Sequence, residues 1–361
     1  MKKKFSLPDF TNAAGPISSI VAILVGLLSG IIILLISNPA RALDGFLWII
    51  AGSLMSPKDI GNVLYYATPI IMTGLSVAFA FRTSLFNIGA SGQFIMGAYG
   101  AVLVGVKLQS LGSFHWIVAL LTSIVFGALW ALIPGILKAY FNVNEVISFI
   151  MTNYIGMYLV NSMVRSTVYH KLTNRSLPVA ESANIPKIGF DKIFPGSSVN
   201  GGIVIAILIS ILIYILLNKT TFGFELKACG FNNDASRYAG INAKKNIVIS
   251  LLIAGALAGM GGGLLYLAGS GKYIYVEDII APEGFTGISV ALLGMSHPIG
   301  TLFAGLFVAY ITVGGSYMQL SGFVPEIIDI ITAIIIYFAA FSLIIRNVLY
   351  KLKTRNAGDK S

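Results

Sequence analysis

The chain alternates long apolar segments with short polar ones. Most of the apolar runs have about 19 to 22 residues, enough for an α-helix that rises about 1.5 Å per residue to cross a hydrocarbon core of about 30 Å. Because the runs are continuous, without the ten-residue alternation of a barrel, the pattern predicts an all-α, polytopic transmembrane helical bundle of about 8–10 membrane segments. The runs are approximately Ile17–Ile36, Val63–Phe81, Leu85–Val106, Trp116–Leu137, Val146–Val164, Ile203–Leu217, Ile247–Ala268, Gly284–Gly294, Ile299–Gly315 and Ile327–Ile345.

The first run could be taken for a signal peptide. It is long, however, and lacks a nearby small-x-small cleavage pattern, so we expect a retained span. Residues 1–16 are then an N-terminal tail, residues 17–345 the transmembrane domain and residues 346–361 a C-terminal tail.

The eighth and ninth runs are short. A helix over Gly284–Gly294 rises only about 17 Å and cannot cross a bilayer alone. Its glycines and the flanking Pro282 and Pro298 indicate a broken or half-depth pair of helices, which a membrane tolerates where the backbone is buried in protein or lines a cavity. A short, thinly covered span is the alternative.

Composition narrows the class further. Hydrophobic residues make up 56% of the chain and charged residues 11%, with a mean hydropathy of +0.86, which excludes an ordinary soluble domain. The single cysteine, Cys229, excludes an intramolecular disulfide and a multi-cysteine metal site. The three histidines share no ligand spacing, so we expect no metal.

The net charge of +10 raises the possibility of a nucleic-acid partner. The basic residues lie between apolar spans, however, so membrane topology explains them better. With the N-terminus inside, fifteen of the 24 lysines and arginines fall on the cytoplasmic side and nine outside, five of these in the longest external loop, residues 165–201. We therefore expect both termini in the cytoplasm and no nucleic-acid partner.

A polar segment, Thr220–Asn246, separates two long apolar runs. Asn232-Asn233-Asp234 can cap a helix start, and Gly240 can end it, which predicts a helix of less than two turns over Asp234–Ala239. Such a short helix needs support from other parts of a protein. A solvated loop and a docking element for a soluble partner both remain open.

The same segment carries a family resemblance. Phe224–Gly230 followed by Ala235–Asn242 resembles the cytoplasmic coupling loop of ATP-binding-cassette importer permeases, in the branch that serves simple sugars, branched-chain amino acids and nucleosides. The resemblance implies that the loop, residues 219–246, presses a short helix onto an ATPase. The residues it assigns to this coupling are Glu225, Asp234, Arg237, Tyr238 and Gly240.

Three further signatures occur in order, and the resemblance covers about Pro69 to Ile345. Leu85–Phe94 resembles the Phe-Asn-Ile-Gly-x-x-Gly-Gln motif of nucleoside and simple-sugar permeases, although the family often has Glu in place of Ser91. Asn144–Ser148 with Met151–Ile155 resembles an Asn-Glu-Val-Ile and Met-x-Asn-Tyr motif. The third signature is Ala291–Gly294, then His297–Gly300 and Gly314-Gly315.

These signatures favour nucleosides over simple sugars such as ribose or galactose. A nucleoside is uncharged, so its path needs flat apolar faces and neutral donors and acceptors. The signatures supply the apolar faces and the neutral hydrogen-bonding groups, and no lysine or arginine lies among these residues. The expected path residues are Asn87, Gln93, Asn153, Phe86, Phe94 and Tyr154. Glu145, at the start of its span, is more readily explained by the helix dipole.

Small residues also recur four apart. Gly255, Gly259 and Gly263 have this spacing, as do Gly97, Ala101 and Gly105. Small residues at i and i+4 let two helix backbones approach closely, so we expect tight helix packing there.

Two other functions compete with a permease. An ion-coupled secondary transporter keeps ionisable residues at mid-membrane depth, whereas the acidic residues here lie at the ends of spans, with Asp329 the least certain. An intramembrane enzyme lacks support, because neither His-Glu-x-x-His nor Gly-x-Ser-x-Gly occurs. No phosphate-binding loop occurs either, so we expect no catalysis and no cofactor, with ATP bound by a partner.

The resemblance implies the remaining partners. They are a homologous permease subunit, a cytoplasmic ATP-binding-cassette ATPase, an extracytoplasmic substrate-binding lipoprotein, membrane lipid and a small-molecule nucleoside.

Overall fold

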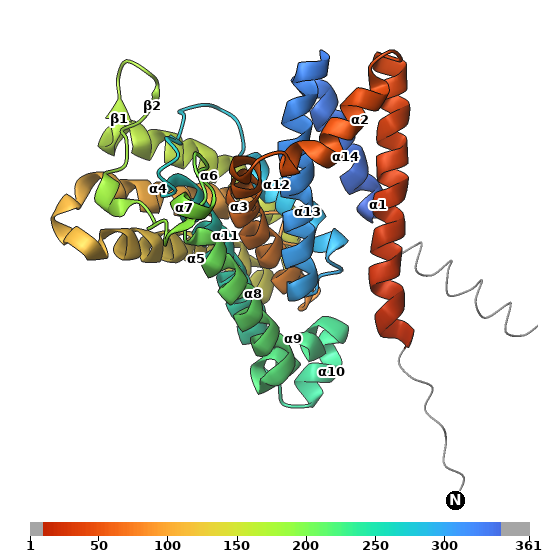
Figure 1. Cartoon of the computed structure of the whole chain (residues 1–361). Helices are drawn as coiled ribbons and strands as arrows, with labels where there is room; N and C mark the ends of the chain where they lie inside the picture. The colour runs from red at the N-terminus through yellow and green to blue at the C-terminus, as the bar shows by residue number, and fades with distance from the viewer. Residues whose placement is uncertain (1–9, 341–361) are drawn as a thin grey trace, which may run out of the picture. The chain divides into compact units, whose positions relative to one another are not determined.

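The computed structural model describes residues 10–340, and most of that range is helical (Figure 1). Six helices in the described part are long and apolar enough to cross a membrane. The predicted all-α, multi-pass bundle is therefore confirmed. Of the predicted tails, residues 346–361 and the first nine residues of 1–16 lie outside the described residues, as does the predicted last span beyond residue 340.

The described residues form two compact units. The smaller unit comprises residues 10–52 and 314–340. Its α1 packs against α14, and α2 packs against α1 and the turn η4. The ring of Trp48 stacks on that of Tyr317 at 5.8 Å. The elements of this unit are α1 (Phe10–Ser37), α2 (Ala42–Ala51), η4 (Met318–Ser321) and α14 (Pro325–Ala340). Helix α2 is an element that the sequence analysis missed, because its apolar run is too short to cross a membrane.

The larger unit comprises residues 53–313. Several observed helices begin before the predicted apolar runs, because polar residues cap them, whereas α4 begins only at Ala90, five residues after the predicted start at Leu85. Ser56 starts α3 well before Val63, and its side chain accepts a hydrogen bond from the Asp59 amide. The long helices are α3 (Pro57–Phe81), α4 (Ala90–Lys107), α5 (His115–Phe141), α6 (Glu145–Thr167), α8 (Gly202–Lys219), α11 (Ala243–Tyr266) and α13 (Pro298–Tyr317), of which the last four residues of α13 belong to the smaller unit. The short elements are η1 (Gly52–Leu54), η2 (Gln109–Phe114), β1 (Tyr169–His170), β2 (Arg175–Ser176), η3 (Glu181–Ala183), α7 (Phe190–Ile193), α9 (Thr221–Phe231), α10 (Asn233–Tyr238) and α12 (Pro282–Leu293).

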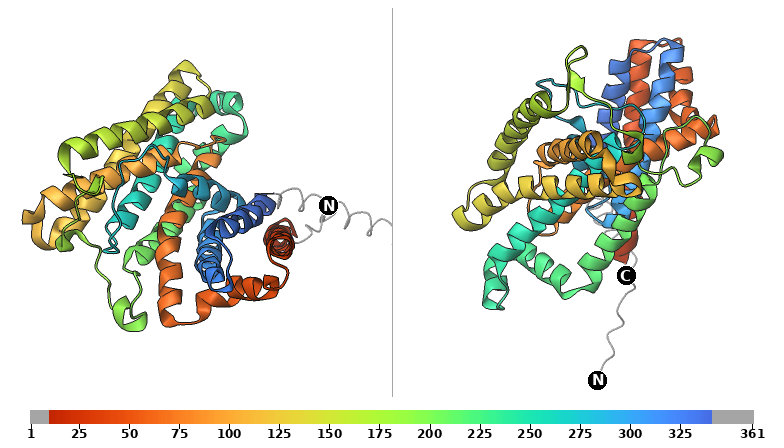
Figure 2. Two further views of the ribbon diagram at one scale, coloured as in Figure 1. Left: turned by 90° about the horizontal axis from the view of Figure 1, so that it is seen from above. Right: turned by 90° about the vertical axis from the view of Figure 1, so that its left-hand side faces the viewer.

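Helix α11 is central to the larger unit, since it contacts α3, α4 and α5 (Figures 1 and 2). Gly259 explains how the backbones come so close. A Cβ atom at this position would lie 2.8 Å from Gly127 Cα on α5, and a Cβ at Gly97 on α4 would overlap Gly259 itself. Gly255 and Gly263, one turn to either side, also face α5. Three helices therefore meet at backbone distance along this line of glycines.

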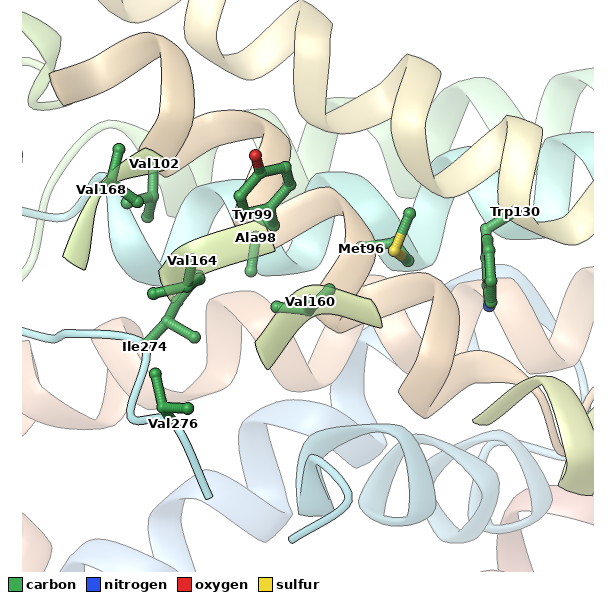
Figure 3. Close-up of a cluster of buried hydrophobic side chains, with 10 residues drawn as sticks. All are labelled: Met96, Ala98, Tyr99, Val102, Trp130, Val160, Val164, Val168, Ile274 and Val276. Carbon is green, nitrogen blue, oxygen red and sulfur yellow. The ribbon is translucent and has the colours of Figure 1, made fainter. Parts of the chain in front are cut away.

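A buried apolar cluster joins α4, α5 and α6 (Figure 3). Trp130 of α5 closes one end of it, and its indole Nε1 donates to the Thr152 carbonyl oxygen at 3.2 Å. The cluster consists of Met96, Ala98, Tyr99, Val102, Trp130, Val160, Val164, Val168, Ile274 and Val276. Ile274 and Val276 come from the segment after α11, so this loop is packed onto the bundle.

The same loop pairs with the hairpin of β1 and β2. The Ser176 amide donates to the Ile274 carbonyl oxygen at 2.8 Å, and the Arg175 guanidinium lies 3.8 Å from the centre of the Tyr273 ring. The predicted long loop, residues 165–201, is thus an ordered cover over one end of the unit (Figure 1).

The predicted half-depth pair is half right. Helix α12 has 12 residues, as expected, and ends at Gly294, where the chain turns with positive φ at Met295 and Ser296. Helix α13, by contrast, has 20 residues, so the expected short ninth segment is wrong. Gly314 and Gly315 do not stop it, because glycine lowers helix propensity by only about 1 kcal/mol and tertiary packing overrides that cost.

Candidate functional site

The polar segment between α8 and α11 folds into two short helices. Thr220 caps α9 by accepting a hydrogen bond from the Gly223 amide at 3.1 Å. Asn232 then caps α10 by accepting from the Ala235 amide at 2.9 Å, and the chain leaves α10 through Gly240 at φ +81°. The predicted short helix is therefore present, one residue earlier than expected. Helix α9 is an addition that the sequence analysis did not foresee.

We call α9 and α10 together the α9–α10 segment. It lies at the far end of α8, opposite the hairpin of β1 and β2 (Figures 1 and 2). This placement leaves it free to present a surface outside the helical bundle.

Buried polar contacts hold the α9–α10 segment on the bundle. Asn246 of α11 donates to the Glu225 carboxylate at 3.1 Å and lies 3.7 Å from Cys229 Sγ. Ser236 of α10 reaches the same sulfur at 3.6 Å. On the other side, Ser84 donates to the Gly230 carbonyl oxygen at 2.6 Å, which ties α9 to the turn after α3. Glu225 is thus turned inward and supports the segment.

The outer face of the segment is aromatic and charged. Phe231 is 91% exposed and Tyr238 95% exposed, and Phe224 is exposed as well. Asp234 and Arg237 are exposed on α10 between them. Large exposed aromatic residues beside charged ones are typical of protein docking surfaces, since aromatic and arginine side chains contribute most to binding.

The predicted path amides lie together inside the bundle. Asn87 and Gln93 are buried and form a reciprocal pair, in which Asn87 Nδ2 donates to Gln93 Oε1 at 2.9 Å and Gln93 Nε2 donates to Asn87 Oδ1 at 3.0 Å. Asn87 also donates to Ser76 Oγ of α3 at 3.0 Å. The pair fixes the chain between α3 and α4, where a free amide would be costly.

Asn153 joins α6 to the same place. Its Oδ1 accepts from the Gly92 amide at 2.8 Å, and its Nδ2 donates to the Ile88 carbonyl oxygen at 3.0 Å. All three amides are therefore bonded to protein in this conformation, and the sequence signatures that carry them meet at one junction of α3, α4 and α6.

The three aromatic residues predicted for the path are dispersed. Phe94 is fully buried beside Tyr65 and Leu265, whereas Phe86 is half-buried and its ring stacks on Phe81 at 5.2 Å. Tyr154 is 49% exposed, although it follows the buried Asn153 directly on α6. Their role as path residues stays a prediction.

Two residues of the sequence signatures, Ser91 and His297, have surroundings that sequence reasoning did not foresee. Among the described residues, Ser91 Oγ is buried without a hydrogen-bond partner, and it faces Gly284 at the start of α12. At the other end of α12, burial lowers the pKa of His297, and the nearby Arg82 guanidinium lowers it further. Both residues lie in segments that the sequence analysis identified. That Ser91 faces Gly284 and that His297 lies near Arg82 depend on the tertiary packing.

Comparison with known proteins gives a consistent result. Residues 60–340 match the family model described as Branched-chain amino acid transport system / permease component. The chain is 40% identical over 339 residues to the guanosine ABC transporter permease protein NupP of Bacillus subtilis, which covers 94% of this chain and 97% of that protein. No solved structure matches the chain.

Two other relatives bear on the substrate class. The nucleoside ABC transporter permease protein NupB of Lactococcus lactis is 36% identical, with 94% of both chains covered. The glucose ABC transporter permease protein TsgB13 of Haloferax volcanii is 32% identical, with 79% of this chain and 77% of that protein covered. The first two organisms each have a second, more distant permease relative, NupQ and NupC, at 29% and 27% identity.

Proposed function

The chain belongs to the branched-chain amino acid transport system permease family, a family of multi-pass membrane proteins, and from this premise we propose that it forms the translocation path for nucleosides in an ATP-binding-cassette importer. Two relatives that each cover 94% of this chain are named for guanosine and nucleoside transport. The more distant glucose permease makes a simple sugar the second candidate.

The α9–α10 segment is the observation that carries a transport role driven by a partner. It is firmly anchored by Glu225, Cys229 and Asn246, yet it presents Phe231 and Tyr238 to solvent. When a docked protein moves, an anchored element with an exposed aromatic face can move with it and displace the helices that it contacts. We propose that the docked partner is the ATPase, which binds and hydrolyses ATP. The permease itself then has no cofactor and no catalytic activity.

The connection from this segment to the path is short. Ser84 links α9 to the turn after α3, and Asn87 lies three residues further along the same turn. Movement of α9 would therefore act on the amide pair directly. We propose that the pair of Asn87 and Gln93, with Asn153, opens during transport and exchanges its internal hydrogen bonds for those of the nucleoside.

The remaining partners follow from the family and the relatives. A second nucleoside permease in each of two organisms supports pairing with a homologous, non-identical subunit. We propose that the α9–α10 segment and both termini face the cytoplasm of a bacterial cell. The cover of residues 165–201 then faces outward, where a substrate-binding lipoprotein would deliver the nucleoside.

Uptake in cells that express the whole importer tests the substrate. We expect unlabelled nucleosides to compete with labelled guanosine, and glucose or ribose not to compete at a hundredfold excess. Asn87→Ala and Asn153→Ala should each lower uptake about tenfold, because a lost hydrogen bond to substrate costs about 1.4 kcal/mol. Co-purification with the ATPase should persist in both variants, and competition by a sugar alone would exclude the nucleoside.

A further inference from the structure

A cavity of about 400 Å³ lies where the end of α5, the helix α10 and the start of α11 meet. Its lining includes the side chains of Lys138, Arg237 and Lys244, with Asn142 and Asn233 beside them. None of the lining residues in this described part of the chain carries a carboxylate. The cavity is therefore suited to an anion.

Within residues 10–340, only part of this positive charge is neutralised. Lys138 pairs with Glu145 at 2.7 Å, which is the ion pair that the described residues place at this cavity. The Lys244 ammonium lies 5.3 Å from the centre of the Tyr140 ring, and Arg237 is exposed. Two cations thus remain for a ligand, and they come from different helices.

The cavity opens at the end of a membrane-spanning helix. An exposed apolar face leads along α5 to Tyr140, with residues spaced four, three and four apart, so that they share one side of the helix: Leu129, Ile133, Ile136 and Tyr140. Tyr140 and the exposed Phe141 stand where aromatic residues mark the membrane interface. A soluble anion would use the cations alone, whereas a lipid would use both the cations and the apolar face.

We propose that the cavity binds the phosphate of an anionic phospholipid, with an acyl chain lying along the exposed face of α5. Basic pockets between membrane helices are suited to anionic headgroups, because the surface potential of such lipids adds to the local attraction. Lys244 contacts the phosphate, and Arg237, which lines the cavity from α10, adds positive charge while its planar fork stays available to a docked protein. The lipid thereby bridges α5 and α10, so its binding would also stabilise the α9–α10 segment. This inference depends on the membrane location of the chain and not on its substrate.

Lipid binding to the purified, assembled importer tests the proposal. The probe is fluorescent phosphatidylglycerol, titrated against importer held in phosphatidylcholine nanodiscs. Lys244→Gln should raise the apparent Kd about fivefold, the effect of one cation near an anionic headgroup. Lys245→Gln is the matched control, since Lys245 is the exposed neighbour in the same helical turn and does not line the cavity. Lys244→Arg should restore the affinity.

Competition distinguishes a lipid from other occupants. Soluble glycerol phosphate should not displace the probe at concentrations where unlabelled phosphatidylglycerol does. Equal displacement by glycerol phosphate would assign the cavity to a soluble anion and overturn the proposal. Equal loss of affinity in the Lys244 and Lys245 variants would also overturn it, because it would indicate general surface charge.

A protein occupant is the remaining alternative. In the assembled importer, Lys244→Cys with a short bifunctional reagent should yield no adduct to the ATPase, and a specific adduct would assign the cavity to that interface. None of these experiments measures transport. The lipid proposal can therefore fail without affecting the nucleoside proposal, and the nucleoside proposal can fail without affecting the lipid proposal.

Discussion

At the scale of single residues, the closest helix contacts in the larger unit depend on glycines, which have no Cβ atom. The line of Gly255, Gly259 and Gly263 allows α11 to touch α5, and Gly97 allows α4 to approach from another side. At Gly97 and Gly259 the nearest atoms belong to backbone, which cannot move aside without shifting a helix, whereas Gly263 faces the side chain of Ser123. The residue scale therefore sets the spacing of the three central helices.

Gly259→Ala should lower stability by about 1–3 kcal/mol, the usual cost of overpacking a buried contact. The added methyl would lie 2.5 Å from the Ser123 carbonyl oxygen and 2.8 Å from Gly127 Cα. The measurement is unfolding of the purified protein in detergent by heat. Gly135→Ala is the control, because its Cβ would lie 3.6 Å or more from Leu251 on the same pair of helices. Similar melting temperatures in both variants would contradict the backbone-contact reading.

At the scale of elements, the short helix α10 owes its position to neighbours. Six residues do not form a stable helix alone in water. Asn232 starts this helix, Ser236 fixes it to α9 through Cys229, and Gly240 ends it. The exposed Arg237 and Tyr238 are consequently held in a defined orientation, which a mobile loop would not provide.

Gly240→Ala should lower substrate-stimulated ATPase activity of the assembled importer several-fold, and Arg237→Ala should do the same. Gly240 has φ +81°, which costs a residue with a side chain about 1 kcal/mol and would tilt the end of α10. Arg237 offers a planar fork to carboxylates or carbonyls of a partner. Gly271→Ala is the matched control, since Gly271 also has positive φ and open space around it but lies away from the segment. Full substrate-stimulated ATPase activity in both the Gly240→Ala and the Arg237→Ala variant would show that the α9–α10 segment does not dock the ATPase.

At the scale of the whole molecule, the larger unit has two different ends. The α9–α10 segment forms one end, and the hairpin with its packed loop forms the other (Figure 1). Long apolar helices, α5 and α11 among them, separate the two. A membrane around these helices places the ends in different compartments, and the distribution of basic residues predicts which end is cytoplasmic.

Cysteine labelling tests this orientation. In a Cys229→Ser background, we expect Leu172→Cys to react with an impermeant maleimide in intact cells and Asp234→Cys to react only after lysis. Leu172 is 90% exposed in the hairpin and Asp234 is exposed on α10, so steric access is not the difference between them. The reverse pattern of labelling would invert the topology.

The sequence by itself determined the class of the molecule and several local features. Continuous apolar runs predict membrane helices because lipid leaves a backbone no other partner for its hydrogen bonds. Asn232 and Gly240 predict the start and end of α10 because caps act within a few residues. Spacings such as that of Gly255, Gly259 and Gly263 predict a close helix contact, since helical periodicity alone puts them on one face.

Only the tertiary structure decided which segments meet. The amides Asn87, Gln93 and Asn153 belong to two separate signatures, and their meeting at one junction depends on how α6 lies against α4. The same holds for the cavity lined by Lys138, Arg237 and Lys244, because Lys138 and Lys244 are more than a hundred positions apart in the sequence. The length of α13 was also decided by packing, which kept Gly314 and Gly315 helical. Contacts between distant segments depend on side-chain shape and on burial summed over the whole bundle, and no local pattern encodes that sum.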